Sequence, residues 1–167
     1  MRCVRSSRVL RLLASAFAIA LVGVGLSATP ASALNHNTYN ILKNADLHQY
    51  CLDIRTEDPP RQARAHLWTC THPVVGEQEF LLVSDSLGHD HIKVLRSGLC
   101  LEGGPAGDTV VQTLCTDFSL ESWDLRDTGE IVNVGNPRCL DAAPADTKDA
   151  DVIVAPCDGS ISQRWFF

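Results

Sequence analysis

Beyond residue 33 the chain alternates short apolar stretches with polar, turn-forming residues, and no stretch keeps a helical period. The stretches are rich in Ile, Leu, Val or aromatic residues, as strands are. They are residues 39–43, 65–68, 80–83, 91–95, 110–114, 123–125, 130–134, 152–155 and 165–167. The pattern therefore predicts an all-β domain.

The same order of elements occurs three times. Each copy opens with Cys-Leu-Asp or Cys-Leu-Glu, continues to a second cysteine, and closes with a Gln/Glu-x-aromatic triplet. The closing aromatics, Phe80, Trp123 and Trp165, are 43 and 42 residues apart. A period of this length indicates a supersecondary unit that cannot bury its apolar face alone. We expect three copies of about four strands each, at residues 39–83, 91–126 and 130–167.

The first 33 residues have the composition of a secretory signal peptide. Four arginines in the first eleven residues are followed by an apolar stretch at residues 12–26 and by Ala31-Ser32-Ala33, which fits a cleavage site. The apolar stretch is shorter than the roughly 20 residues that span a bilayer. We therefore expect a secreted protein whose mature domain comprises residues 34–167, with no membrane span.

Removal of this segment leaves six of the seven cysteines, an even number in an oxidising compartment. Zinc is the alternative use of these cysteines, but no C-x-x-C pair occurs. The repeat favours one disulfide within each copy. The expected bridges are Cys51–Cys70, Cys100–Cys115 and Cys139–Cys157.

Charge narrows the possible partners. Without the four N-terminal arginines the formal net charge changes from −6 to −10, with ten basic and twenty acidic residues. So acidic a surface repels phosphate backbones and anionic lipids. Nucleic acid is therefore not expected as a partner, whereas a neutral glycan or a basic protein is compatible with this charge.

The Cys-Leu-Asp openings and the three Q-x-W-like triplets resemble those of the ricin-type lectin family, and the resemblance covers the whole mature chain. It implies a β-trefoil fold in which the triplet aromatics share one core. Two triplets depart from the family pattern. Phe80 replaces a tryptophan, which conserves packing, and Glu121 replaces a glutamine, so its carboxylate needs a hydrogen-bond donor or solvent.

The resemblance also implies which residues form a sugar site. Its parts are the acid of Cys-Leu-Asp, an aromatic residue two positions before the second cysteine, and an asparagine before the triplet glutamine. The first copy supplies Asp53, Trp68 and Gln78, with Glu77 in place of the asparagine. An ionised glutamate accepts hydrogen bonds but cannot donate them, so the sugar preference should differ from the usual galactose.

The other two copies lack the stacking ring. In the third copy Asp141 and Gln163 are present, but Ala155 and Ser162 replace the aromatic residue and the asparagine, which leaves at most a weak site. In the second copy the corresponding residues are Glu102, Thr113 and Leu120, and we expect a structural role. Asp53 and Asp141 have a structural alternative as well, because aspartate commonly caps turns.

Catalytic motifs are scarce. His89-Asp90-His91 raises the alternative of a metal or acid–base site, but Gly88 marks a turn before it, and a solvated loop is our preferred interpretation. No H-E-x-x-H, G-x-S-x-G or phosphate-binding glycine motif occurs. We therefore expect no enzyme activity, no metal site and no cofactor.

Two functions of different class remain. The first is a secreted carbohydrate-binding module for a galactose-type or other neutral sugar, favoured by Asp53 and Trp68. The second is a trefoil that has lost sugar binding and acts by protein contact, as a hydrolase inhibitor or an assembly subunit. The missing rings of copies two and three, and the proline-stiffened loop at residues 56–61, favour the second. Fold alone does not choose between them.

Overall fold

The computed structural model describes residues 36–47, 49–105, 107–142 and 147–166, so the expected signal peptide lies outside the described residues. Over these ranges the chain is all-β, with three short 3₁₀-helices. The helices are η1 (Pro60–Gln62), η2 (Ser119–Glu121) and η3 (Ile161–Gln163). The strands are β1 (Tyr39–Asn40), β2 (Lys43–Asn44), β3 (Tyr50–Ile54), β4 (Ala65–Thr69), β5 (Phe80–Ser84), β6 (Asp90–Val94), β7 (Cys100–Glu102), β8 (Val111–Thr113), β9 (Ser122–Leu125), β10 (Ile131–Asn133), β11 (Cys139–Asp141), β12 (Ile153–Ala155) and β13 (Trp165–Phe166).

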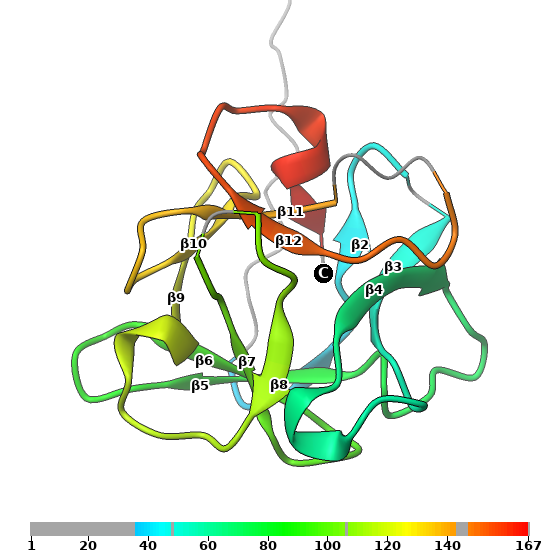
Figure 1. The fold of residues 1–167 in the computed structure, drawn as a ribbon, viewed down its shortest axis with the longest axis horizontal. Coiled ribbons are helices and arrows are strands. Elements are labelled where there is room, and N and C mark those ends of the chain that lie inside the picture. Colours follow the sequence, from blue (N-terminus) through cyan, green and yellow to red (C-terminus); the bar gives the residue numbers. More distant parts are fainter. Residues whose placement is uncertain (1–35, 48, 106, 143–146, 167) are drawn as a thin grey trace, which may run out of the picture.

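Each repeat contains an antiparallel hairpin that starts at its first cysteine or just before it. The hairpins are β3–β4, β7–β8 and β11–β12, and Figure 1 shows them on different sides of the molecular centre. The first cysteine of each hairpin lies opposite a residue of the partner strand. These opposite residues are Trp68, Thr113 and Ala155, so the structure gives the three positions equivalent registers.

A ring of backbone hydrogen bonds joins the three repeats at the centre. Ala65 N donates to Val110 O at 2.7 Å, Val110 N to Val152 O at 2.8 Å, and Val152 N to Ala65 O at 2.9 Å. All three residues are fully buried. Each repeat thus donates to the next, which confirms the predicted three-copy architecture of a β-trefoil.

The triplet aromatics form the expected shared core. Phe80, Trp123 and Trp165 are buried together with the leucines of the three hairpins. The indole nitrogen of Trp123 donates to Leu101 O at 3.1 Å, and that of Trp165 donates to Leu140 O at 3.0 Å. Phenylalanine cannot make this bond, so the first repeat keeps the packing of the triplet without its polar contact.

Three disulfides link Cys51 to Cys70, Cys100 to Cys115 and Cys139 to Cys157, as predicted. Each closes a loop within one repeat, and the partners are 19, 15 and 18 positions apart in sequence. In the chain-entropy description, disulfide loops of this size stabilise the folded state by about 3 kcal/mol each.

No helix among the described residues is long and apolar enough to cross a membrane.

The first predicted strand, residues 39–43, is in fact two strands. Tyr39–Asn40 pairs with β5, whereas Lys43–Asn44 pairs with β3 and β13. The chain changes partners at Ile41-Leu42, where the fully buried Leu42 anchors it to the core. The prediction failed here because apolar content marks a buried stretch without showing that the stretch serves two sheets.

Candidate functional site

In the first repeat a buried amide holds the predicted carboxylate. The Gln78 side-chain nitrogen donates to Asp53 Oδ2 at 2.6 Å and to Thr69 O at 3.1 Å, and Asp53 lies in β3. Its oxygen accepts from the Thr71 backbone nitrogen at 3.0 Å and from the Thr71 hydroxyl at 3.2 Å. Gln78 is fully buried. It therefore positions Asp53 and ties down the backbone just after Cys70.

The third repeat contains the same arrangement. Gln163 donates to Asp141 Oδ2 at 2.8 Å and to Pro156 O at 2.9 Å, and it accepts from Asp158 N at 3.0 Å. The carboxylate–amide pair and the tie to the residue after the second cysteine thus recur. Sequence reasoning identified these residues but not the bonds between them, since the amide was expected to face a sugar.

In the second repeat the triplet residue still binds the backbone after the second cysteine, but it forms no carboxylate–amide pair. Glu121 accepts hydrogen bonds from the Thr116 backbone nitrogen and from the Thr116 hydroxyl, the latter at 2.8 Å. These are the donors that the buried carboxylate was expected to need. An ionised Glu121 has no proton for Glu102. Burial, and then the neighbouring Glu121 carboxylate, raise the pKa of Glu102 above its ordinary range.

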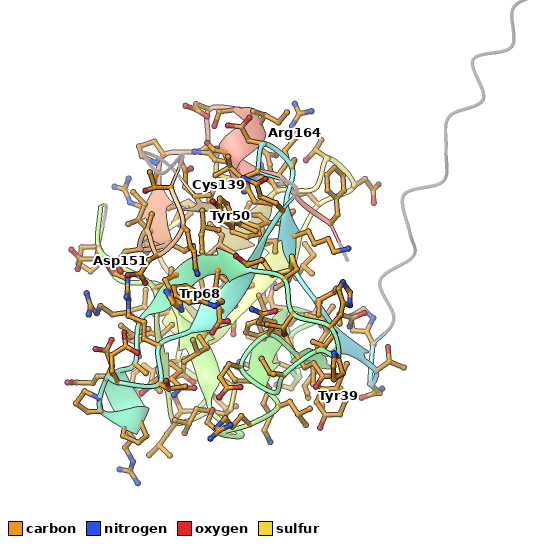
Figure 2. The ribbon with its side chains drawn as sticks, turned by 90° about the vertical axis from the view of Figure 1, so that its right-hand side faces the viewer. Tyr39, Tyr50, Trp68, Cys139, Asp151 and Arg164 are labelled. Atoms are coloured by element: carbon orange, nitrogen blue, oxygen red, sulfur yellow. A yellow bond between two sulfur atoms is a disulfide. The ribbon has the colours of Figure 1, made fainter. Side chains whose placement is uncertain are left out.

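The first repeat also has a cavity. A hollow of about 410 Å³ opens beside Asp53, Trp68 and Glu77. Trp68 is half-buried, which leaves part of its ring accessible, and Figure 2 shows it beside the strands of the first hairpin. The structure therefore brings three of the four predicted first-repeat residues to one cavity, with Gln78 behind Asp53. The other lining residues are Ile54, Thr56, Glu57, His66, Thr71, Val75, Arg96 and Asp149.

A lysine from the third repeat lies against the predicted stacking ring. Lys148 Nζ is 3.6 Å from the centroid of the Trp68 ring, a cation–π contact. The His66 ring lies 5.5 Å from the same ring, tilted by 32°. Sequence reasoning missed Lys148, because nothing in the sequence around it indicates a contact with another repeat.

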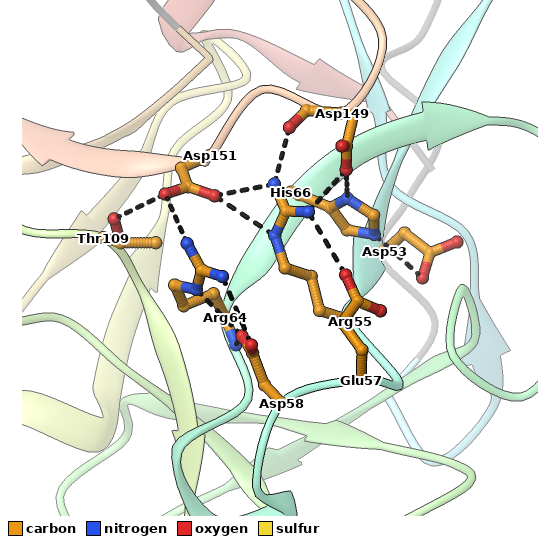
Figure 3. Close-up of polar contacts among 9 residues, drawn as sticks. All are labelled: Asp53, Arg55, Glu57, Asp58, Arg64, His66, Thr109, Asp149 and Asp151. Atoms are coloured by element: carbon orange, nitrogen blue, oxygen red, sulfur yellow. Dashed lines mark hydrogen bonds and ion pairs between the residues drawn. The ribbon is translucent and has the colours of Figure 1, made fainter.

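Charged side chains fix this third-repeat segment to the first hairpin (Figure 3). Arg55 binds Asp149 Oδ1 at 2.6 Å and Asp151 Oδ1 at 2.9 Å. His66 Nδ1 lies 2.8 Å from Asp149 Oδ1, and its Nε2 lies 3.5 Å from Asp53 Oδ1. The hydrogen bond with His66 and the Arg55 charge keep the pKa of Asp149 below its usual range. The network thus links the position of Lys148 to that of Asp53.

Glu77 occupies the place of the family asparagine, and it is paired. Arg96 Nη1 lies 2.8 Å from Glu77 Oε1, and Arg96 comes from the turn between β6 and β7 of the second repeat. The Glu77 side chain is nearly buried, whereas that of Arg96 is 67% exposed. Both side chains line the cavity, so its edge presents a cation as well as an anion.

The histidine triplet singled out in the sequence is part of the β5–β6 hairpin. Asp90 and His91 lie in β6, so the expected loop contains only His89. His89 Nδ1 lies 2.5 Å from Asp124 Oδ1, and this bond raises the pKa of His89. Among the described residues, no group of three or more His, Cys, Asp or Glu is arranged to hold a metal ion.

Comparison with known proteins supports the fold and a binding role. The ricin-type beta-trefoil lectin domain matches residues 38–165. Among solved structures, the designed 3-fold symmetric protein ThreeFoil is similar at 21% identity and a TM-score of 0.68, over 77% of this chain and 96% of that chain. The agglutinin from Abrus precatorius is similar at 23% identity and a TM-score of 0.66, over 77% and 47%.

A third structure is an exo-beta-1,3-galactanase from Clostridium thermocellum, at 18% identity and a TM-score of 0.70, over 78% of this chain and 30% of that chain. This chain thus spans less than half of the galactanase and of the agglutinin, and at such identities the likeness concerns the fold. A search of curated proteins finds no match. The domain match and the lectin neighbours support a carbohydrate-binding module. By the match over residues 38–165, the chain belongs to the ricin-type β-trefoil lectin domain family.

Proposed function

We propose that the protein is a secreted carbohydrate-binding module with its main site at the first-repeat cavity. The observation that carries the proposal is the Asp53 carboxylate, held at 2.6 Å by Gln78 at the cavity wall that also includes Trp68. A fixed carboxylate accepts hydrogen bonds from vicinal hydroxyls, and an indole covers the apolar face of a pyranose. Asp141 and Gln163 provide a second, weaker site at most.

Charge indicates the class of sugar. Asp53, Glu57, Glu77 and Asp149 line the cavity, against Arg96 and a histidine. An anionic sugar would be repelled by this excess of carboxylates, so a neutral sugar is the fitting ligand. Because Glu77 replaces the family asparagine, the preferred neutral sugar should differ from galactose, so galactose is tested beside other neutral sugars.

Secretion is proposed on two grounds. The N-terminal segment has the composition of a signal peptide with a cleavage site after Ala33. The three disulfides require an oxidising compartment to form and persist. Expression of the full chain with sequencing of the exported protein tests this, and a mature N-terminus near Leu34 is expected.

A glycan array on the mature protein tests the site. Trp68→Ala and Asp53→Asn should each lower the signal at least about tenfold, because one removes the stacking surface and the other removes the carboxylate charge. Asp141→Asn, the same chemical change in the third repeat, is the matched control and should leave most of the signal. Binding that survives Trp68→Ala unchanged would place the site elsewhere, and a wild type that binds no glycan would refute the function.

Action by protein contact is the second candidate, and one observation favours it. The Lys148 ammonium already lies against Trp68, so a sugar would have to share or displace this contact. Much of the loop at residues 56–61 is exposed. If this candidate holds, replacement of residues 56–61 by a glycine-serine loop abolishes a measured hydrolase inhibition or assembly, whereas Trp68→Ala leaves it intact.

A further inference from the structure

A second cavity adjoins the first. It has a volume of about 270 Å³ and lies between the loop after β3 and the β6–β7 turn. The two cavities share Ile54, Thr56, Glu77 and Arg96 as lining residues. The two cavities therefore adjoin at the Glu77–Arg96 ion pair, and the second lies at the boundary between the first and second repeats.

The second cavity combines buried apolar residues with a fixed polar side. Ala63 and Val94 are buried and line it together with Ile54. Gln112, only 4% exposed, donates from its side-chain nitrogen to Pro60 O at 2.6 Å. Its oxygen accepts from the Ser97 hydroxyl at 2.6 Å. These bonds join β8, η1 and the β6–β7 turn, so the walls are preorganised, which lowers the entropic cost of binding.

The charges around the second cavity balance. Its lining includes two arginines, Arg55 and Arg96, and two acidic residues, Asp58 and Glu77. Gln112 bonds two uncharged residues, Ser97 and Pro60. Fixed polar groups such as those of Ser97 and Gln112 suit a sugar ring, which has a rim of hydroxyls. An ionic ligand gains little from a balanced set of charges, so a neutral ligand fits best.

We infer that the two cavities form one groove that binds a linear neutral oligosaccharide of at least two units. One unit lies against Trp68 and Asp53, and the next lies beyond Glu77 and Arg96, near Ser97 and Gln112. The inference rests on the proposed function, because it assumes a sugar in the first cavity. In this groove the second repeat, which lacks a stacking ring, contributes to recognition of the oligosaccharide through its β6–β7 turn.

A chain-length series tests the groove. Affinities are measured by titration calorimetry for galactose, glucose and xylose and for their linear oligomers of two to four units. In the preferred series, the second unit should raise the affinity about tenfold, and the fourth unit should add little. Ser97→Trp, which fills the second cavity from its rim, should abolish the gain and leave the affinity for the single sugar unchanged.

Two further variants distinguish filling of the second cavity from misfolding. Pro60→Trp fills the same cavity from η1 and should act like Ser97→Trp, whereas Ser86→Trp, in a turn outside both cavities, should keep the gain. Binding of the single sugar without any gain from longer chains overturns the groove and leaves the proposed function standing. Equal loss of single-sugar and oligomer binding in both filling variants also overturns it, and no binding of any sugar in all three series defeats both proposals.

Discussion

The first and third repeats hold the same carboxylate–amide pair in different surroundings. Gln78 bonds Asp53 and Gln163 bonds Asp141, each with a second bond that ties the backbone after the second cysteine. Opposite the first cysteine, however, the first repeat has Trp68 and the third has Ala155. The pair alone therefore does not distinguish the two repeats, and the sugar site proposed for the first repeat also requires the Trp68 ring.

The first residue of the triplet has two roles, which are to bind the backbone after the second cysteine and to bond the carboxylate of the opening motif. In the second repeat it has only the first role. Glu121 ties down Thr116 as the glutamines tie down their counterparts, yet it cannot donate to Glu102. The backbone tie is thus the part that all three repeats share. The hydrogen bond to the carboxylate of the Cys-Leu-Asp motif requires an amide, and under the proposed function this bond orients Asp53 for a sugar.

The largest expected effect comes from removing the amide in each of the two matched repeats. Gln78→Ala and Gln163→Ala each remove the hydrogen bond that the amide donates to a buried carboxylate, and each leaves a backbone nitrogen without its acceptor. Each should lower the free energy of unfolding by about 3 kcal/mol. Denaturant titration of the two variants beside the wild type measures this loss.

Sugar binding should distinguish the same two variants. Gln78→Ala should weaken binding because Asp53 loses the hydrogen bond from the amide, whereas Gln163→Ala keeps the wild-type affinity while it remains folded. If both variants bind sugar as tightly as the wild type, the amide of the first repeat has no positioning role. Equal loss in both would mean that the third repeat contributes to the main site.

The sequence predicted the features that lie within one repeat. The disulfides, the core aromatics and the hairpin order recur with the period, so three copies supported each inference. The contact of Lys148 with Trp68 was not predictable, because it joins different repeats and depends on the Arg55, Asp149 and Asp151 network. The buried state of Gln78 was missed for another reason, since a polar residue near a site was assumed to face the ligand.

An intermediate effect is expected in the second repeat. Glu121→Gln replaces one of two neighbouring carboxylates with an amide that can bond Glu102, as Gln78 bonds Asp53. At about pH 7 the variant should gain about 1 kcal/mol of stability, allowing for screening by solvent around the half-buried Glu102. Denaturant titration across the pH range measures the gain.

The gain should depend on pH in a defined direction. The folded-state pKa of Glu102 is raised above 4.5 by burial and by Glu121, so the proton on Glu102 stabilises the wild type fully below pH 4.5. That stabilisation disappears as the pH rises through the raised pKa. The advantage of Glu121→Gln should therefore shrink toward about pH 4. A gain of the same size at both pH values would contradict repulsion between the two carboxylates as its cause.

The smallest expected effect concerns the lysine that the third repeat places on the first-repeat ring. Lys148→Ala removes a cation–π contact worth about 0.5–1 kcal/mol, so a sugar that stacks on Trp68 no longer competes with the ammonium. Sugar affinity should rise about two- to fivefold by titration calorimetry. Lys93→Ala, which removes a half-exposed lysine from β6 outside both cavities, is the matched control and should leave the affinity unchanged. A lower affinity in Lys148→Ala would mean that the ammonium itself contacts the ligand, and the first-repeat site would then be completed by the third repeat instead of being restrained by it.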